Sequence, residues 1–361
     1  MDRQFPPEII QIIVEASLQP FDPFTAPSTE FVLRYSTLKP YSLLNSTWRD
    51  VSRPLLRQSC QLGSEASLRS FLEIARSENG MMEEVQKLFI HMHNVETLDM
   101  SKLRCTPHLI SLGIGDCDEL SLDDLAQFQK LQELALIQVN MVVSPASPPL
   151  RLPCLRHLVY SCYSLDRDQP AFPSLKSETF PQLRYLQILH VIPPDITTLL
   201  PQLEAIRITP ELPALLPAAK SLQLLELPCD PSTRLDMLSR LPSLPPFLFL
   251  DFATHHALDP ELQFRRQQVR DALEQLADDQ RAGHRVILLR KFGIDETVEV
   301  VISRLRQRAI QVVVVETQIF FSGAIAEMER ILAEENKKRE RDGMGMIREG
   351  AGRRGGAVVR R

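Results

Sequence analysis

Several features that would place this 361-residue sequence in a common class are missing from it. It contains no apolar run approaching the roughly 18 residues that a membrane-spanning helix needs, and its N-terminus lacks the apolar segment of a secretory leader. We therefore expect a protein of the cytoplasm or nucleus. The six cysteines occur singly, without a CxxC pair, which favours free thiols. A net charge of −5 is too small to indicate nucleic acid as a partner.

Recognisable catalytic and metal-binding motifs are also missing. The sequence has no GxSxG, P-loop or HExxH motif, and the Gly-Ile-Gly at residues 113–115 lacks the third glycine of a dinucleotide-binding turn. Cys105, His108 and Cys117 do not complete a set of four ligands at a known zinc spacing. Since no nucleophile, base and orienting group occur together, the sequence predicts a protein that is not an enzyme and that holds no cofactor or metal.

What the sequence does contain is an apolar helix, predicted directly after the two prolines at residues 6–7, where a missing N–H disturbs no hydrogen bond. Its aliphatic residues recur at helical spacing and cover more of the helix than a small core requires. They are Ile9, Ile10, Ile12, Ile13, Val14, Ala16 and Leu18. We therefore expect this helix to be buried on two sides, one of them against another protein.

Two further helices are expected before residue 58. One begins near Thr29 and ends at Pro40, and the next carries Trp48 and ends before Pro54. With the first helix they predict a helical domain over residues 1–58.

Residues 5–10 (Phe-Pro-Pro-Glu-Ile-Ile) and 43–49 (Leu-Leu-Asn-Ser-Thr-Trp-Arg) resemble the F-box pattern, in which Leu-Pro-x-Glu and an aliphatic helix precede an aliphatic-x-x-x-Trp-Arg helix. Phe5 replaces the family's leucine and the first interhelical loop is longer than usual, but phenylalanine also fills an apolar pocket and loops absorb insertions. The resemblance implies docking on Skp1 in a Skp1–cullin–F-box ubiquitin ligase. The implied contact residues are Phe5, Pro6, Ile9, Ile13, Leu44 and Trp48. A helical cap with a wholly internal apolar core is the alternative.

An L-x-x-L-x-L pattern with aliphatic substitutions returns from Val95 onward, at intervals typical of leucine-rich repeats, about 20 to 29 residues. The clearest copies are Leu109/Leu112/Ile114, Leu131/Leu134/Leu136, Leu155/Leu158/Tyr160, Leu183/Leu186/Ile188, Leu203/Ile206/Ile208 and Leu222/Leu225/Leu227. Val95/Leu98/Met100 is the expected first copy and Leu244/Phe247/Phe249 a later one. We expect a solenoid with a curved parallel sheet over residues 95–258, preceded by a helical linker or N-terminal cap at 59–94.

Within each repeat strand, the fourth and sixth positions are expected to be buried, while the third, fifth and seventh project from the concave face. Projecting residues are candidates for target recognition because they are free of core packing. They include Glu133, His157, Tyr185, Gln187, Arg207 and Glu226. Their mixed chemistry fits a protein or peptide epitope better than a polyanion. The alternative for any single residue is that it is exposed to solvent and contacts no target.

The C-terminal third alternates helices with strands. A helix is predicted from Asp259 to Gly283 and another over residues 295–308, with buried strands at 286–289 and 310–315. This alternation implies parallel pairing, so we expect residues 259–336 to extend the repeat sheet, with a separate small α/β domain as the alternative. The Pro-rich residues 144–153 predict a surface loop, and the basic Gly/Arg-rich residues 337–361 a disordered tail, with contact to RNA or an acidic partner as its alternative.

The sequence as a whole predicts an α/β protein of the F-box and leucine-rich-repeat type. Its expected role is that of a noncatalytic adaptor, which binds Skp1, and through it a cullin, and recruits an unknown protein target. No membrane or nucleic-acid partner is expected. The open alternatives are a repeat scaffold outside any ubiquitin ligase and an enzyme housed in the C-terminal α/β units.

Overall fold

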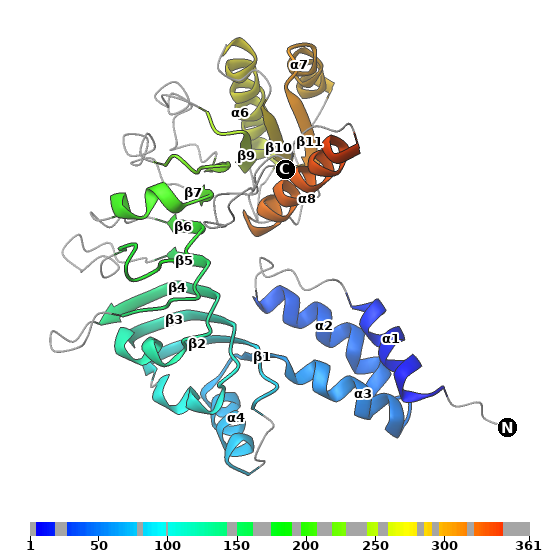
Figure 1. Cartoon of the computed structure of the whole chain (residues 1–361), viewed down its shortest axis with the longest axis vertical. Coiled ribbons are helices and arrows are strands. Elements are labelled where there is room, and N and C mark those ends of the chain that lie inside the picture. The colour runs from blue at the N-terminus through cyan, green and yellow to red at the C-terminus, as the bar shows by residue number, and fades with distance from the viewer. Residues whose placement is uncertain are drawn as a thin grey trace, which may run out of the picture. The chain divides into compact units, whose positions relative to one another are not determined.

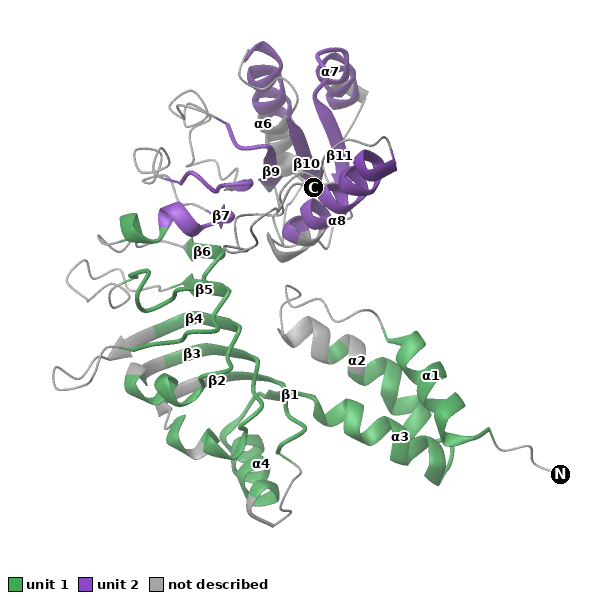
Figure 2. Cartoon of the chain, in the orientation of Figure 1, with its two compact units in different colours: residues 1–199 green, residues 200–361 purple. Residues whose placement is uncertain are grey.

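The computed structural model (Figure 1) describes residues 5–18, 27–77, 82–98, 100–142, 150–161, 175–189, 196–207, 219–228, 244–251, 259–279, 285–290, 296–315 and 321–341. The chain divides into two compact units, Met1–Leu199 and Leu200–Arg361 (Figure 2). Each unit combines helices with parallel strands that pair in chain order. The chain is therefore a mixed α/β protein.

The first unit begins with three helices, α1 (Pro7–Ser17), α2 (Pro27–Ser42) and α3 (Ser46–Arg57). The predicted helix ends at Pro40 and before Pro54 are wrong, because both prolines lie inside their helices. Each proline loses one hydrogen bond to the carbonyl four residues earlier, but it lies within three residues of the end of its helix, so only a short helical stretch follows it. The helices therefore continue to Ser42 and Arg57.

A small core joins these three helices. Ile10 and Val14 of α1 and Leu38 of α2 are buried, and half-buried residues that include Tyr41 and Trp48 pack against them. The Tyr41 and Trp48 rings stack with their centroids 5.3 Å apart. This core fixes both ends of the turn that connects α2 with α3.

The α2–α3 turn is also fixed by hydrogen bonds. The Asn45 side chain accepts a hydrogen bond of 3.1 Å from the backbone N–H of Trp48 and so caps α3. The backbone N–H groups of Leu43 and Leu44 donate to the carbonyls of Pro40 and Tyr41, each over 3.1 Å. Leu43 and Leu44 are thus held in a defined turn.

The rest of the first unit is built on six parallel strands, stacked in chain order in Figure 1. They are β1 (Ser59–Leu62), β2 (Lys87–Leu98), β3 (Ser111–Ser121), β4 (Glu133–Val142), β5 (His157–Ser161) and β6 (Tyr185–Leu189). Helix α4 (Glu65–Ser77) connects β1 with β2, and 3-10 turns η1 (Met100–Cys105) and η2 (Leu122–Gln127) follow β2 and β3. A further 3-10 turn, η3 (Ile196–Thr198), follows β6.

The strand register confirms the repeat pattern. Residues at the fourth position of successive copies are paired across the strands, and so are residues at the sixth position. The first series is Leu88, Leu112, Leu134, Leu158 and Leu186, and the second is Ile90, Ile114, Leu136, Tyr160 and Ile188. All ten side chains are buried, so the aliphatic triplets form one continuous core in this unit.

The same register places the first repeat copies upstream of Val95. Leu88 and Ile90 of β2 pair with Leu112 and Ile114, so Val85/Leu88/Ile90 is a copy that the sequence displays but that we did not assign. Val95 instead pairs with Cys117, beyond an irregularity in the strand. Residues 59–94, expected as a helical linker or cap, therefore contribute β1 and the beginning of β2 to the sheet.

The second unit has five parallel strands in chain order. They are β7 (Ala205–Arg207), β8 (Leu224–Pro228), β9 (Phe247–Asp251), β10 (Val286–Arg290) and β11 (Gln311–Val315). Helices α6 (Asp259–Asp278) and α7 (Glu296–Gln307) connect the last three strands, and the 3-10 turn η4 (Leu200–Gln202) precedes β7. Since β10 pairs with both β9 and β11, the C-terminal strands extend the sheet of this unit.

The last helix, α8 (Phe321–Arg341), is absent from the sequence-based expectations. It packs against β8 and β9 through an apolar stripe that includes Ala324, Ile325, Met328 and Ile331. The helix continues five residues into the segment expected to be a disordered tail, and residues 342–361 lie outside the described part of the chain. The Pro-rich residues 144–149 and position 208 lie outside it as well.

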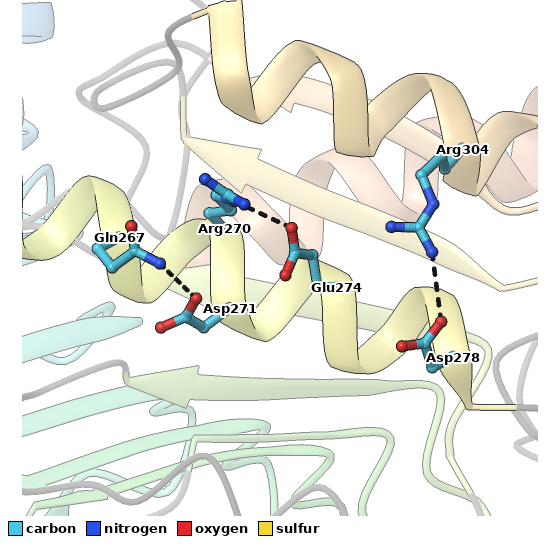
Figure 3. Close-up of polar contacts among 6 residues, drawn as sticks. All are labelled: Gln267, Arg270, Asp271, Glu274, Asp278 and Arg304. Carbon is cyan, nitrogen blue, oxygen red and sulfur yellow. Dashed lines mark hydrogen bonds and ion pairs between the residues drawn. The ribbon is translucent and has the colours of Figure 1, made fainter.

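The outer surface of α6 carries polar contacts that are visible in Figure 3. Gln267 donates to Asp271 over 2.6 Å, and the Arg270 guanidinium lies 2.9 Å from the carboxylate of Glu274. Arg304 of α7 reaches Asp278 of α6 at 3.4 Å. These exposed pairs contribute little free energy of folding, about 0.5 kcal/mol each, so they are typical of a solvated helix surface.

Substitution of Leu134 by alanine should lower the free energy of unfolding by roughly 2–5 kcal/mol, because this side chain is buried in the triplet core. Urea unfolding followed by circular dichroism measures the change. Ile137→Ala is the matched control on the same strand, where a side chain that is 38% exposed should lose less than about 1 kcal/mol. Equal losses for the two variants would contradict the repeat register.

Candidate interaction surfaces

Helix α1 has apolar residues on two sides. Ile10 and Val14 face the small core and are buried, whereas Ile9 and Ile12 are 41% and 61% exposed. Phe5, just before the helix, is 56% exposed and precedes Ile9 by four residues. The sequence predicted burial of α1 on two sides, and within the described chain only the side with Ile10 and Val14 is covered.

The α2–α3 turn also carries exposed apolar side chains. Leu43 and Leu44 are 70% and 61% exposed although hydrogen bonds hold their backbone. Among the described residues, seven of the eleven exposed large apolar side chains lie between Phe5 and Leu44. We call Phe5, Ile9, Ile12, Leu43 and Leu44 the N-terminal apolar set. Such a concentration of exposed apolar side chains is typical of a protein-binding surface.

The residues implied by the F-box resemblance fall into two groups. Phe5, Pro6, Ile9 and Leu44 are exposed, whereas Ile13 and Trp48 are half-buried. Because Trp48 stacks on Tyr41 and packs against the small core, its role in the structure is to hold the helices together. Sequence reasoning missed Ile12 and Leu43 as contact candidates. Their signals were present, since Ile12 belongs to the helical apolar pattern and Leu43 precedes Leu44.

A row of polar side chains runs across the first unit at the third repeat position. The register pairs its members from β1 to β6 in the order Ser59, Lys87, Ser111, Glu133, His157 and Tyr185. The His157 and Tyr185 rings meet edge to face with their centroids 4.5 Å apart. The structure therefore brings three predicted target-binding residues, Glu133, His157 and Tyr185, side by side.

The expectation that projecting residues are free of core packing is wrong for Tyr185 and Glu226. Tyr185 is 7% exposed and Glu226 is completely buried. In the second unit Glu226 pairs in register with Arg207, and their charged groups lie 3.0 Å apart. A buried carboxylate needs a nearby cation, so we assign this ion pair a structural role. Of the predicted target-binding residues, Glu133, His157 and Gln187 keep partly exposed side chains in the first unit.

The fifth position is partly accessible in β4 to β6, where it forms a middle row, whereas Phe89 and Gly113 at this position of β2 and β3 are buried. Ala135, Val159 and Gln187 are half-buried in the middle row, and Ile137 at the seventh position of β4 is exposed. The middle of this face is therefore formed by small and apolar side chains, beside the polar row of the third position.

Two neighbouring strands share a backbone feature at the end of this face. Asp116 of β3 and Gln138 of β4 both adopt positive φ angles, 54° and 59°, directly after the paired residues Gly115 and Ile137. The His91 side chain lies over Gly115, where an added Cβ would be 2.8 Å from Nδ1, and its Nε2 lies 3.1 Å from the Asp116 carboxylate. The lack of a side chain at Gly115 thus allows the contact between His91 and Asp116.

The described ranges hold no cluster of metal-ligating side chains. No three His, Cys, Asp or Glu side chains lie close enough there to hold a metal ion. Cys60, Cys105, Cys117 and Cys154 are not in disulfides, while Cys162 and Cys229 lie outside these ranges. Burial raises the pKa of the Cys60 thiol to about 11, which disfavours the reactive thiolate.

Among the described helices, none combines the length and the apolar character that spanning a membrane requires.

Comparisons with known proteins give little further information. No protein-family model matches the sequence, and no curated protein matches it significantly. Among solved structures, an internalin (InlF) from Listeria monocytogenes is 15% identical, with a TM-score of 0.33 over 66% of this chain and 77% of that one. The APL1 leucine-rich repeat domain is 16% identical, with a TM-score of 0.24 over 48% of this chain and 40% of that one. The repeat assignment therefore rests on the strand register of this chain.

The stability of the protein should fall in mild acid because of His157. Burial, with a smaller contribution from the Arg156 charge, lowers the pKa of His157 from 6.5 to about 3. The unfolded chain binds this proton more readily than the folded protein, so stability decreases as the pH drops from 6.5 toward 3. Between pH 6.5 and about pH 5, His157 should account for a loss of roughly 2 kcal/mol.

Urea unfolding at several pH values measures this loss, which His157→Gln should largely remove. His108→Gln, the same substitution at an exposed histidine, is the matched control. An identical pH dependence in wild type and His157→Gln would show that the imidazole is not the titrating group.

Proposed function

We propose that the chain is a noncatalytic adaptor of a Skp1–cullin–F-box ubiquitin ligase, acting in the cytoplasm or nucleus. The N-terminal helices bind a Skp1-like subunit, and through it a cullin. The repeat strands recruit a protein target for ubiquitination. The observation that carries this proposal is the N-terminal apolar set, displayed on helices whose own core is already complete.

The geometry of the helices supports docking over an internal capping role. A cap would bury its apolar residues against the neighbouring repeat, but Ile9, Ile12 and Leu44 are exposed, and the apolar core of the helices is formed by Ile10, Val14 and Leu38 instead. Helix α2 contacts β1 and β2, and α3 contacts β1, which attaches the helices to the repeat strands. The N-terminal apolar set stays exposed and takes no part in this attachment.

The repeat strands of the first unit support target recruitment in a different way. Their projecting face offers partly exposed polar groups, Glu133, His157 and Gln187, next to the apolar Ala135, Val159 and Ile137. An apolar centre with polar neighbours is the usual composition of a protein-binding surface. In this function the strands supply a rigid support, and the side chains between the core positions supply specificity.

The double variant Ile9→Asp/Ile12→Asp should reduce copurification with coexpressed Skp1 at least about tenfold, because two carboxylates would be desolvated at the interface. Val300→Asp/Val314→Asp in the second unit is the matched control. These valines are 63% and 42% exposed, against 61% and 41% for Ile12 and Ile9, so both variants place charge at similarly exposed sites. The control should retain full recovery of Skp1.

Circular dichroism of both variants establishes that each remains folded. Recovery of Skp1 that is unchanged in Ile9→Asp/Ile12→Asp would refute the proposed docking. The repeat strands would then belong to an interaction scaffold that works outside a ubiquitin ligase.

A further inference from the structure

Basic side chains gather where the strands of the first unit begin. Arg104, Lys130, Arg151, Arg156 and Lys176 are all exposed and lie in the segments that lead into β3 to β6, from one residue (Arg156) to nine residues (Lys176) before the strand begins. None of the five forms an ion pair with a carboxylate of the described residues. With the half-buried Arg184 and the exposed His108 they form what we call the basic edge. In a chain with a net charge of −5, such a local excess of cations requires an explanation.

Backbone hydrogen bonds show that these residues are neighbours in space. The N–H of Arg184 donates to the carbonyl of Arg156 over 2.9 Å, and the N–H of Arg156 donates to Gln132 over 2.8 Å. The side chain of Gln129 donates to the carbonyl of Arg151 over 3.4 Å, and Lys130 Nζ lies 3.3 Å from Nδ1 of His108. These contacts place His108, Lys130, Arg151, Arg156 and Arg184 along successive strands, which are about 4.8 Å apart.

The basic edge also reaches the polar row of the projecting face. Arg156 immediately precedes His157, the first residue of β5, and its positive charge adds to the effect of burial in lowering the pKa of His157. His157 in turn contacts Tyr185, the first residue of β6, and Arg184 immediately precedes Tyr185. A ligand held by the basic edge would therefore lie beside the partly exposed side chains of that face.

Acidic groups limit the basic edge. On the side of β2, Glu84 lies 4.0 Å from Arg57 and is thereby engaged. Glu178 is the exposed carboxylate of the described chain between Lys176 and Arg184. Asp116 lies in the middle of β3, and Asp123 and Asp124 lie in η2, after the strand has ended at Ser121. Glu133, the first residue of β4, also lies at this end of the strands, so Glu133 and Glu178 are, outside η2, the described carboxylates in the segments that lead into β3 to β6, and the five exposed cations outnumber them.

We propose that the basic edge binds an acidic segment of the protein target, through glutamate, aspartate or phosphorylated side chains. The edge extends over four strands, roughly 15 Å, which an extended peptide of about five residues would cover. A nucleic acid is a poorer fit, because the aromatic rings nearby, Phe180 and Tyr185, are buried and offer no surface for stacking bases. This inference specifies the target of the proposed adaptor and rests on that function.

Fluorescence anisotropy of the full chain with a labelled glutamate-rich peptide, and separately with a phosphoserine peptide, tests the proposal. The variant Arg104→Ser/Lys130→Ser/Arg156→Ser should bind the preferred peptide about tenfold more weakly than wild type. The matched control, Lys337→Ser/Lys338→Ser/Arg339→Ser, removes the same charge from exposed positions of α8 and should bind as wild type does. Binding by wild type should also weaken at higher ionic strength.

Three results would overturn the inference: equal losses in both triple variants, no binding of either peptide by wild type, or a single-stranded RNA that binds more tightly than both peptides through the same cations. Because all three residues of the edge variant are exposed, its circular dichroism should match wild type. Recovery of Skp1 by this variant is measured in parallel and should be unchanged. Wild type that recovers Skp1 but binds neither peptide would show failure of this inference alone, and wild type that binds a peptide but does not recover Skp1 would show failure of the proposed function.

Discussion

The parallel register of the repeat strands is the constraint on which the structure depends. One short strand cannot hide its aliphatic side chains, so Leu112, Leu134 and Leu158 are buried only because each lies level with its counterpart on the next strand. Once this alignment is fixed, the residues between them are aligned as well. The polar row, the middle row and the basic edge all follow from the register that the aliphatic core imposes.

The sequence predicted this core well because aliphatic spacing reports directly on burial. It was less informative about where the array begins, since Val85, Leu88 and Ile90 follow the same spacing but lie in a segment that the amphipathic pattern of α4 led us to interpret as helical. Helix α8 was missed because its apolar stripe is narrow and its charged residues are many, which in a single sequence resembles a solvated tail.

The sequence predicted which residues project from the strands, but not how exposed the side chains of these residues are. Alternation along a strand shows which side chains leave the core, and Glu133, His157 and Tyr185 do lie in one row. Whether such side chains meet water depends on what else packs over them, which a strand's own sequence does not contain. Glu226 is an example. It lies at a repeat position expected to project away from the aliphatic core, yet it is fully buried beside Arg207.

Exposed leucine and isoleucine side chains have a second effect besides recognition, because they lower solubility. A chain that carries Phe5, Ile12 and Leu43 uncovered will tend to associate with other copies of itself when nothing else covers them. The supply of the partner would then determine how much of the chain stays dispersed. A surface of this kind makes the abundance of one protein follow the abundance of another.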